Sequence, residues 1–130
     1  MRGTGKTAPQ PVTALEKAML ARGALMDKRA VDPVVLDLRE ITLITDYFVI
    51  CHGTSNVHIR ALSEAVIEAL KEAGVRPAGV EGRQAARWVL LDYGDLIVHI
   101  FAEEEREFYS LERLWSDAAR IEDEAAAATT

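Results

Sequence analysis

The sequence has 130 residues, 49% of them hydrophobic, so it is long enough for one domain with a core and too short for two. Its net charge of -6 repels phosphate backbones, which argues against free nucleic acid as the main partner. No apolar run approaches the ~20 residues of a membrane helix and the N-terminus lacks the apolar core of a signal peptide, so neither membrane insertion nor export is expected.

Residues 1–12 are rich in glycine, proline and threonine, and this composition predicts a disordered leader. The leader contains Gly5, Lys6 and Thr7, which resemble the end of a phosphate-binding P-loop, but the upstream glycine and the preceding buried strand of that motif are missing. A helix over about 13–28 is predicted to follow. Thr13 is its expected cap, because Glu16 stands three positions further on.

Two strands are predicted next. From Pro33, alternation places Val34 and Leu36 on one face and Val35 on the other. The following segment "DYFVICHG" is apolar almost throughout, which is typical of a strand covered on both faces. It ends at Gly53.

The residues after Gly53 allow two interpretations. Strand, glycine, hydroxyl and helix N-terminus together can hold a phosphate. Alternatively, Thr54 or Ser55 is simply the N-cap of a helix, a feature worth ~1 kcal/mol without any ligand. The predicted helix has an apolar stripe and stops at Gly74. The stripe consists of Ile59, Leu62, Val66, Ala69, Leu70 and Ala73.

A short extended segment, "PAGVEG", precedes a predicted hairpin, "RWVLLDYGDLIVHIF". A turn at Tyr93 and Gly94 would set three pairs of residues opposite each other: Asp92 and Asp95, Leu90 and Ile97, Trp88 and His99. One last helix is predicted over about 105–119, with an apolar stripe of Phe108, Leu111, Trp115 and Ala118. Residues 120–130 are predicted to fray.

Strands and helices alternate along the chain. This order predicts the α/β class, with a single mixed sheet of about five strands packed with helices.

A magnesium-dependent nucleotidyltransferase using Ser55, Asp92 and Asp95 is one functional hypothesis, because such an enzyme needs a Gly-Ser turn and metal-binding carboxylates. The spacing argues against it. Carboxylates two apart on one strand point to the same side, whereas these two aspartates flank a turn. We therefore expect no catalytic site.

The histidines and the cysteine do not have metal-ligand spacing. Cys51 and His52 are adjacent on a strand and face opposite ways, while His58 and His99 lie on later elements. Neither a metal nor a cofactor is expected. As the single cysteine, Cys51 cannot form an internal disulfide, which fits a reducing compartment and makes the cytoplasm the expected location.

A protein-binding surface is the third hypothesis. Trp88, Leu90, Ile97 and His99 share one face of the hairpin, and Arg106, Tyr109, Arg113 and Asp117 form a stripe on the last helix. A tryptophan, a tyrosine and arginines together are typical of binding hot spots. The alternative is that Trp88 belongs to the core and Tyr109 is an edge residue.

Three segments resemble the ribosomal silencing factor RsfS family, also called the iojap or YbeB family, over residues 15–118. They are "LDLREITLITDYFVICHGTSNVHIRALSEAVIEAL", "GVEGRQAARWVLLDYGDLIVHIF" and "EFYSLERLWSDA". The resemblance defines a family domain over 13–119. It implies a nucleotidyltransferase-like fold without known transferase activity. One departure is His58, where many relatives have arginine or glutamine.

The resemblance further implies binding to the large ribosomal subunit through its ribosomal protein number fourteen. This binding would block joining of the small subunit and repress translation when nutrients are scarce. The family's contact surface falls on Trp88 and Tyr109 here, and geometry adds Leu90, Arg106 and Arg113. A weak homodimer is also expected, because self-association would cover the exposed aromatic patch.

Overall fold

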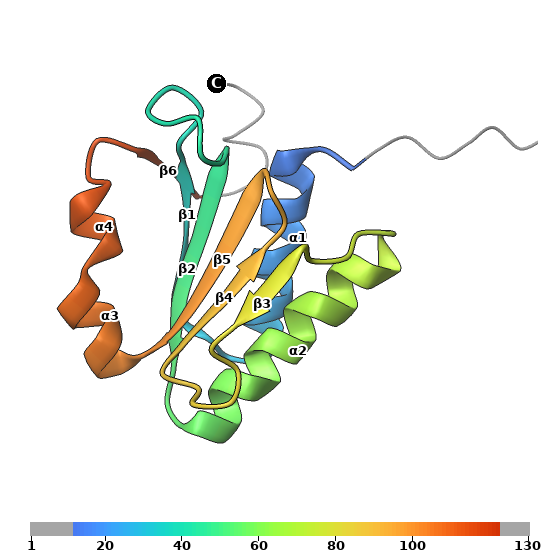
Figure 1. Cartoon of the computed structure of the whole chain (residues 1–130), viewed down its shortest axis with the longest axis vertical. Helices are drawn as coiled ribbons and strands as arrows, with labels where there is room; N and C mark the ends of the chain where they lie inside the picture. Colours follow the sequence, from blue (N-terminus) through green and yellow to red (C-terminus); the bar gives the residue numbers. More distant parts are fainter. Residues whose placement is uncertain (1–11, 123–130) are drawn as a thin grey trace, which may run out of the picture.

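The computed structural model describes residues 12–122, so the predicted leader, apart from Val12, and residues 123–130 lie outside the described part. Figure 1 shows the elements in chain order. They are α1 (Ala14–Asp27), β1 (Val31–Asp37), β2 (Tyr47–Gly53), α2 (Asn56–Glu72), β3 (Gly79–Glu81), β4 (Trp88–Asp92), β5 (Leu96–Ala102), α3 (Glu103–Tyr109), α4 (Leu111–Leu114) and β6 (Ala119–Ile121).

Within the described range, six strands form one mixed sheet in the order β3-β4-β5-β2-β1-β6. β2 and β5 run parallel, and the other neighbouring strands are antiparallel. α1 and α2 cover one face of the sheet, while α3 and α4 lie on the other (Figure 1). The predicted α/β class with a single mixed sheet is confirmed.

The core has two layers because the central strands are buried on both faces. Val35, Val49 and Cys51 pack towards α1 and α2. Phe48 and Ile50 pack on the opposite face, beside residues of α4. The prediction that the "DYFVICHG" strand is covered on both sides is confirmed.

Local capping signals are also confirmed. Thr13 and Glu16 form a reciprocal capping box at the start of α1, with N–O distances of 3.1 and 2.9 Å. Ser55 caps α2, since its Oγ accepts a hydrogen bond from the backbone N–H of His58 at 3.0 Å. The Ser55 hydroxyl therefore has a partner within the helix, as the N-cap interpretation predicts.

The hairpin register differs from the prediction by two residues. The observed pairs are Asp92 with Ile97, Leu90 with His99, and Trp88 with Phe101. The loop is longer than expected because the Tyr93 N–H bonds to the Leu96 carbonyl at 2.8 Å, and the Gly94 N–H bonds to the Asp92 side chain at 2.8 Å. A shift of two preserves the alternation of faces, so the grouping of hairpin residues by face still holds.

The prediction of a single last helix over about 105–119 is wrong. The chain breaks at Ser110, which has left-handed φ and ψ values of 47° and 52°, and two short helices result. Phe108, expected in the core, is therefore 80% exposed. After α4, β6 pairs with β1, with Ile121 opposite Val35, so ordered structure continues past the predicted end at residue 119.

Candidate functional site

Three aromatic rings meet on the sheet face that α3 partly covers. The ring of Trp88, from β4, lies 4.5 Å from the ring of Tyr109 and 4.9 Å from that of Phe101, measured between centroids. Trp88 is half-buried, and Tyr109 is 46% exposed. Trp88 thus belongs partly to the core and partly to the surface, so neither of the two alternatives raised by the sequence is complete.

Exposed apolar side chains extend this cluster. Phe108 contacts Tyr109 edge-on, with ring centroids 5.0 Å apart. Leu90 is half-buried and lies two residues from Trp88 on the same face of β4. We call Trp88, Leu90, Phe108 and Tyr109 the aromatic face. The sequence assigned Phe108 to the core, because the helix break that exposes it has no signal in the apolar periodicity.

Acidic side chains border the aromatic face. Glu104 and Glu105, from the first turn of α3, line an open pocket together with Phe108 and Tyr109. Arg87 pairs with Glu105 at 2.8 Å and with Glu104 at 3.5 Å. A partner with basic side chains around an apolar patch would complement this arrangement.

Arg106 does not lie on the surface where the sequence analysis placed it. It is 7% exposed, and its guanidinium forms a bidentate pair with Glu112 at 3.0 Å for both bonds. It also donates to the carbonyls of Val31 and Asp32, at 2.9 and 2.8 Å, and to Nδ1 of His52 at 3.0 Å. Because these groups occupy its donors, Arg106 joins α3 and α4 to the sheet and is not available to a partner.

The Arg106 cluster also sets local charge states. Burial would raise the pKa of Glu112, but hydrogen bonds and the charge of Arg106 outweigh it and hold that pKa below its usual value. The pKa of His52 is lowered, first by burial and then by the charge of Arg106. His52 is therefore neutral at neutral pH and can accept the Arg106 hydrogen bond.

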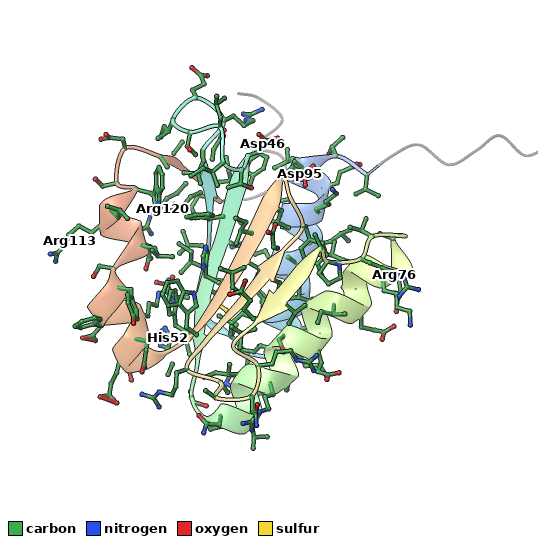
Figure 2. All side chains as sticks on the ribbon, in the orientation of Figure 1. Asp46, His52, Arg76, Asp95, Arg113 and Arg120 are labelled. Carbon is green, nitrogen blue, oxygen red and sulfur yellow. The ribbon has the colours of Figure 1, made fainter. Side chains whose placement is uncertain are left out.

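Arg113 is the charged residue of the predicted site that remains at the surface. It is exposed on α4, and Figure 2 shows it pointing away from the sheet. Arg76, which lies beyond the end of α2, is on the opposite side of the molecule in the same view. Substitutions of Arg113 and Arg76 therefore change the charge on two different surfaces.

The magnesium-transferase constellation is not assembled. β2 and β5 run parallel with Tyr47 opposite Leu96, which puts Asp95 at the start of the pair and Ser55 beyond its far end. The strand length between them is roughly 20 Å. Asp95 and His52 appear at opposite ends of the sheet (Figure 2). Asp95 instead pairs with Lys17 at 2.9 Å.

The three histidines have separate partners. His52 accepts from Arg106, and His99 accepts from the indole N–H of Trp88 at 3.1 Å. His58 accepts from the Thr54 N–H at 3.0 Å, and its Nε2 donates to the Lys28 carbonyl at 2.8 Å. Within residues 12–122, no three His, Cys, Asp or Glu side chains are grouped so that they could hold a metal ion. In the same range, no helix is long and apolar enough to cross a membrane.

The fold and the aromatic face define a small α/β domain that presents a partly packed aromatic cluster to solvent. Residues 11–130 match the family described as "Ribosomal silencing factor during starvation". The chain therefore belongs to the ribosomal silencing factor family, as the resemblance predicted.

Individual relatives agree with this assignment. The chain is 44% identical over 99 residues to ribosomal silencing factor RsfS of Bacillus subtilis, covering 76% of this chain and 84% of that one. It is 42% identical over 107 residues to RsfS of Halalkalibacterium halodurans, covering 82% and 92%. A crystal structure of a Chromobacterium violaceum protein superposes with a TM-score of 0.78 and 36% identity, covering 80% of this chain and 87% of that one.

Proposed function

We propose that this chain represses translation by binding the large ribosomal subunit through its ribosomal protein number fourteen. In this proposal the bound chain occupies space that the small subunit needs, so the two subunits do not join. No chemical step is involved. The repression operates when nutrients are limiting, in the cytoplasm.

The aromatic face is the observation that carries the proposal. Trp88 and Tyr109 contact each other and still expose part of their surface, and Phe108 is 80% exposed beside them. Large aromatic side chains that lose their remaining exposure on docking dominate the energetics of many interfaces. Trp88, Leu90, Tyr109 and Arg113 are the proposed contact residues, and Arg106 acts indirectly by fixing α3.

Charge supports a protein partner over bare RNA. The chain has a net charge of -6, and Glu104 and Glu105 border the aromatic face. Phosphates would be repelled from such a rim, whereas a basic protein surface would be attracted to it. If the acidic domain docks on a ribosomal protein, it can bind the ribosome without lying against the RNA phosphates that would repel it.

Membership of the family supports the ribosome as the target. A more distant mouse relative is named "Mitochondrial assembly of ribosomal large subunit protein 1" and is 34% identical over 95 residues, which cover 71% of this chain and 42% of that one. That name places the relative with the large subunit. We extend the same subunit preference to this chain.

Self-association is a second part of the proposal. A weak homodimer would cover the aromatic face in the free protein, because exposed apolar patches above a few hundred Å² are uncommon on monomers. Light scattering over a concentration series should show a rising mass. A constant monomer mass would remove the dimer and leave the ribosomal proposal intact.

Co-sedimentation with separated ribosomal subunits tests the main proposal. The parent chain should pellet with large subunits, remain in solution with small subunits, and inhibit subunit joining. Isolated ribosomal protein number fourteen should bind it directly. Trp88→Glu should weaken large-subunit binding by ~2 to 4 kcal/mol, or roughly thirtyfold to a thousandfold.

Matched arginine variants locate the surface. Arg113→Glu should weaken binding, whereas Arg76→Glu makes the same change of charge on the opposite side of the molecule and should not. Tyr109→Ala should weaken binding more than it lowers the melting temperature. The proposal is wrong if Trp88→Glu and Tyr109→Ala both melt normally and still bind large subunits and block joining as well as the parent.

A further inference from the structure

The orientation of the Trp88 ring is fixed from beneath the aromatic face. Trp88 is half-buried on β4, and its apolar contacts with Phe101 and Tyr109 do not by themselves fix the direction of the indole N–H. Any freedom of this ring in the unbound chain would be lost on docking and would weaken binding. A contact that holds the ring beforehand therefore contributes to affinity.

His99 supplies such a contact. It lies on β5 opposite Leu90, so it shares a sheet face with Trp88 as a diagonal cross-strand neighbour. The indole Nε1–H of Trp88 donates to Nδ1 of His99 at 3.1 Å. His99 itself is 4% exposed and is held edge-on against Phe48, with ring centroids 4.5 Å apart.

The hydrogen bond determines the tautomer of His99. An indole N–H can only donate, so Nδ1 must be the acceptor and the proton must be on Nε2. Burial lowers the pKa of His99 to about 4, so the ring stays neutral and keeps this acceptor throughout the physiological range.

The same arrangement has a cost for folding. The buried Nε2 of His99 has no hydrogen-bond partner within the described part of the chain. An unsatisfied buried donor destabilises the folded state, and a leucine at this position would remove it, at the cost of the acceptor for the Trp88 indole N–H. A histidine here is thus better explained by the orientation of Trp88 than by stability alone.

We propose that His99 is a positioning residue for docking: its Nδ1 holds the Trp88 indole in the orientation that the partner recognises. This inference rests on the proposed function, because it concerns the same aromatic face. It adds a residue that is itself too deeply buried to touch the partner.

Two substitutions of His99, one with and one without an acceptor, test this role. His99→Asn keeps an acceptor oxygen close to the position of Nδ1, whereas His99→Leu places a methyl group there. Binding to large subunits should stay within about threefold of the parent in His99→Asn and fall by about tenfold or more in His99→Leu. The indole N–H resonance of Trp88 should keep its hydrogen-bonded shift only in the parent and in His99→Asn.

Stability should rank the variants in the opposite order. His99→Leu removes the unsatisfied Nε2 donor but takes the acceptor from the Trp88 indole N–H, so it should melt close to the parent, whereas His99→Asn leaves a small polar cavity and should melt lower. A purely structural role would make binding follow the melting temperature. Such a result, or parent-like binding by His99→Leu, overturns the positioning role while binding by the parent upholds the proposed function. If the parent itself does not bind, both proposals fall.

Discussion

The rings of Trp88 and Tyr109 are in contact although the residues come from β4 and α3, with centroids 4.5 Å apart and an interplanar angle of 45°. This contact joins the sheet to the first helix after β5. Each ring packs against further aromatic side chains, yet Trp88 is only half-buried and Tyr109 is 46% exposed. Packing and docking thus use the same two side chains, so stability and binding must be measured separately.

The Trp88–Tyr109 contact should appear as a coupling energy. Urea unfolding of the parent, Trp88→Ala, Tyr109→Ala and the double variant should give a favourable coupling of about 0.5 to 1.5 kcal/mol, typical of aromatic pairs. Trp88→Ala combined with Met26→Ala serves as the control, because Met26 is exposed on α1 across the sheet. Those two changes should add within about 0.5 kcal/mol. A coupling near zero for the aromatic pair would contradict the contact.

Arg106→Ala should destabilise the fold strongly. It leaves the Glu112 carboxylate, two backbone carbonyls and His52 without their common donor, and breaking a buried pair typically costs ~3 to 5 kcal/mol. Arg106→Lys should recover less than half of the loss, because one ammonium group cannot replace the forked guanidinium. Chemical unfolding monitored by circular dichroism measures both variants.

Arg39→Ala is the matched control for that prediction. Arg39 also forms a bidentate pair, with Asp37, at 2.9 and 2.7 Å, but its side chain is 50% exposed. Water screens such a pair, so its loss should cost less than about 1 kcal/mol. Equal losses for the two arginines would show that burial does not distinguish them.

Acid should destabilise the chain through His99. Its pKa is lowered by burial from a usual value of 6.5 to about 4. Between these values the unfolded chain binds a proton that the folded chain does not. The free energy of unfolding should therefore fall by about 3 kcal/mol as the pH falls from 6.5 to 4, with only a small further loss from His99 below pH 4.

His99→Leu isolates this effect. Its unfolding free energy should depend on pH between 6.5 and 4.5 with a slope smaller by roughly one proton. His52, whose pKa is also lowered, should leave a residual slope of the same sign. Contributions from Glu112 and Asp37, whose pKa values lie below normal, should appear mainly at lower pH. An unchanged slope in His99→Leu would contradict the assignment.

Cys51 should resist alkylation in the folded chain. The thiol is buried, and burial raises its pKa to about 12, so about one molecule in ten thousand carries a thiolate at pH 8. Iodoacetamide should modify it only through unfolding, as followed by mass spectrometry. The Arg106→Ala variant should react faster than the parent, in proportion to its lower stability. Rapid modification of the folded parent would show that the thiol is accessible.

Short-range signals predicted the elements that depend on neighbours along the chain. The Thr13–Glu16 capping box, a hydroxyl cap at Thr54 or Ser55 and the stripe of α2 each involve residues three or four positions apart. The box was confirmed and the cap is Ser55. Ile59, Leu62, Val66 and Leu70 of the stripe are buried. The hairpin faces were also predicted, because alternation survives a register shift of two. The register itself was not, since it depends on hydrogen bonds within the loop from Tyr93 to Leu96.

The residue pattern was sufficient for the α/β class, the order of the main elements and the family. Tertiary structure alone decided that the last helix breaks at Ser110, that Phe108 faces solvent and that Arg106 is buried. The physical reason is the distance along the chain between the partners. The guanidinium of Arg106 is held by Val31 and Asp32, 75 and 74 residues away, and by His52, 54 residues away. Periodicity within one helix carries no information about such partners, so only the folded chain brings them together.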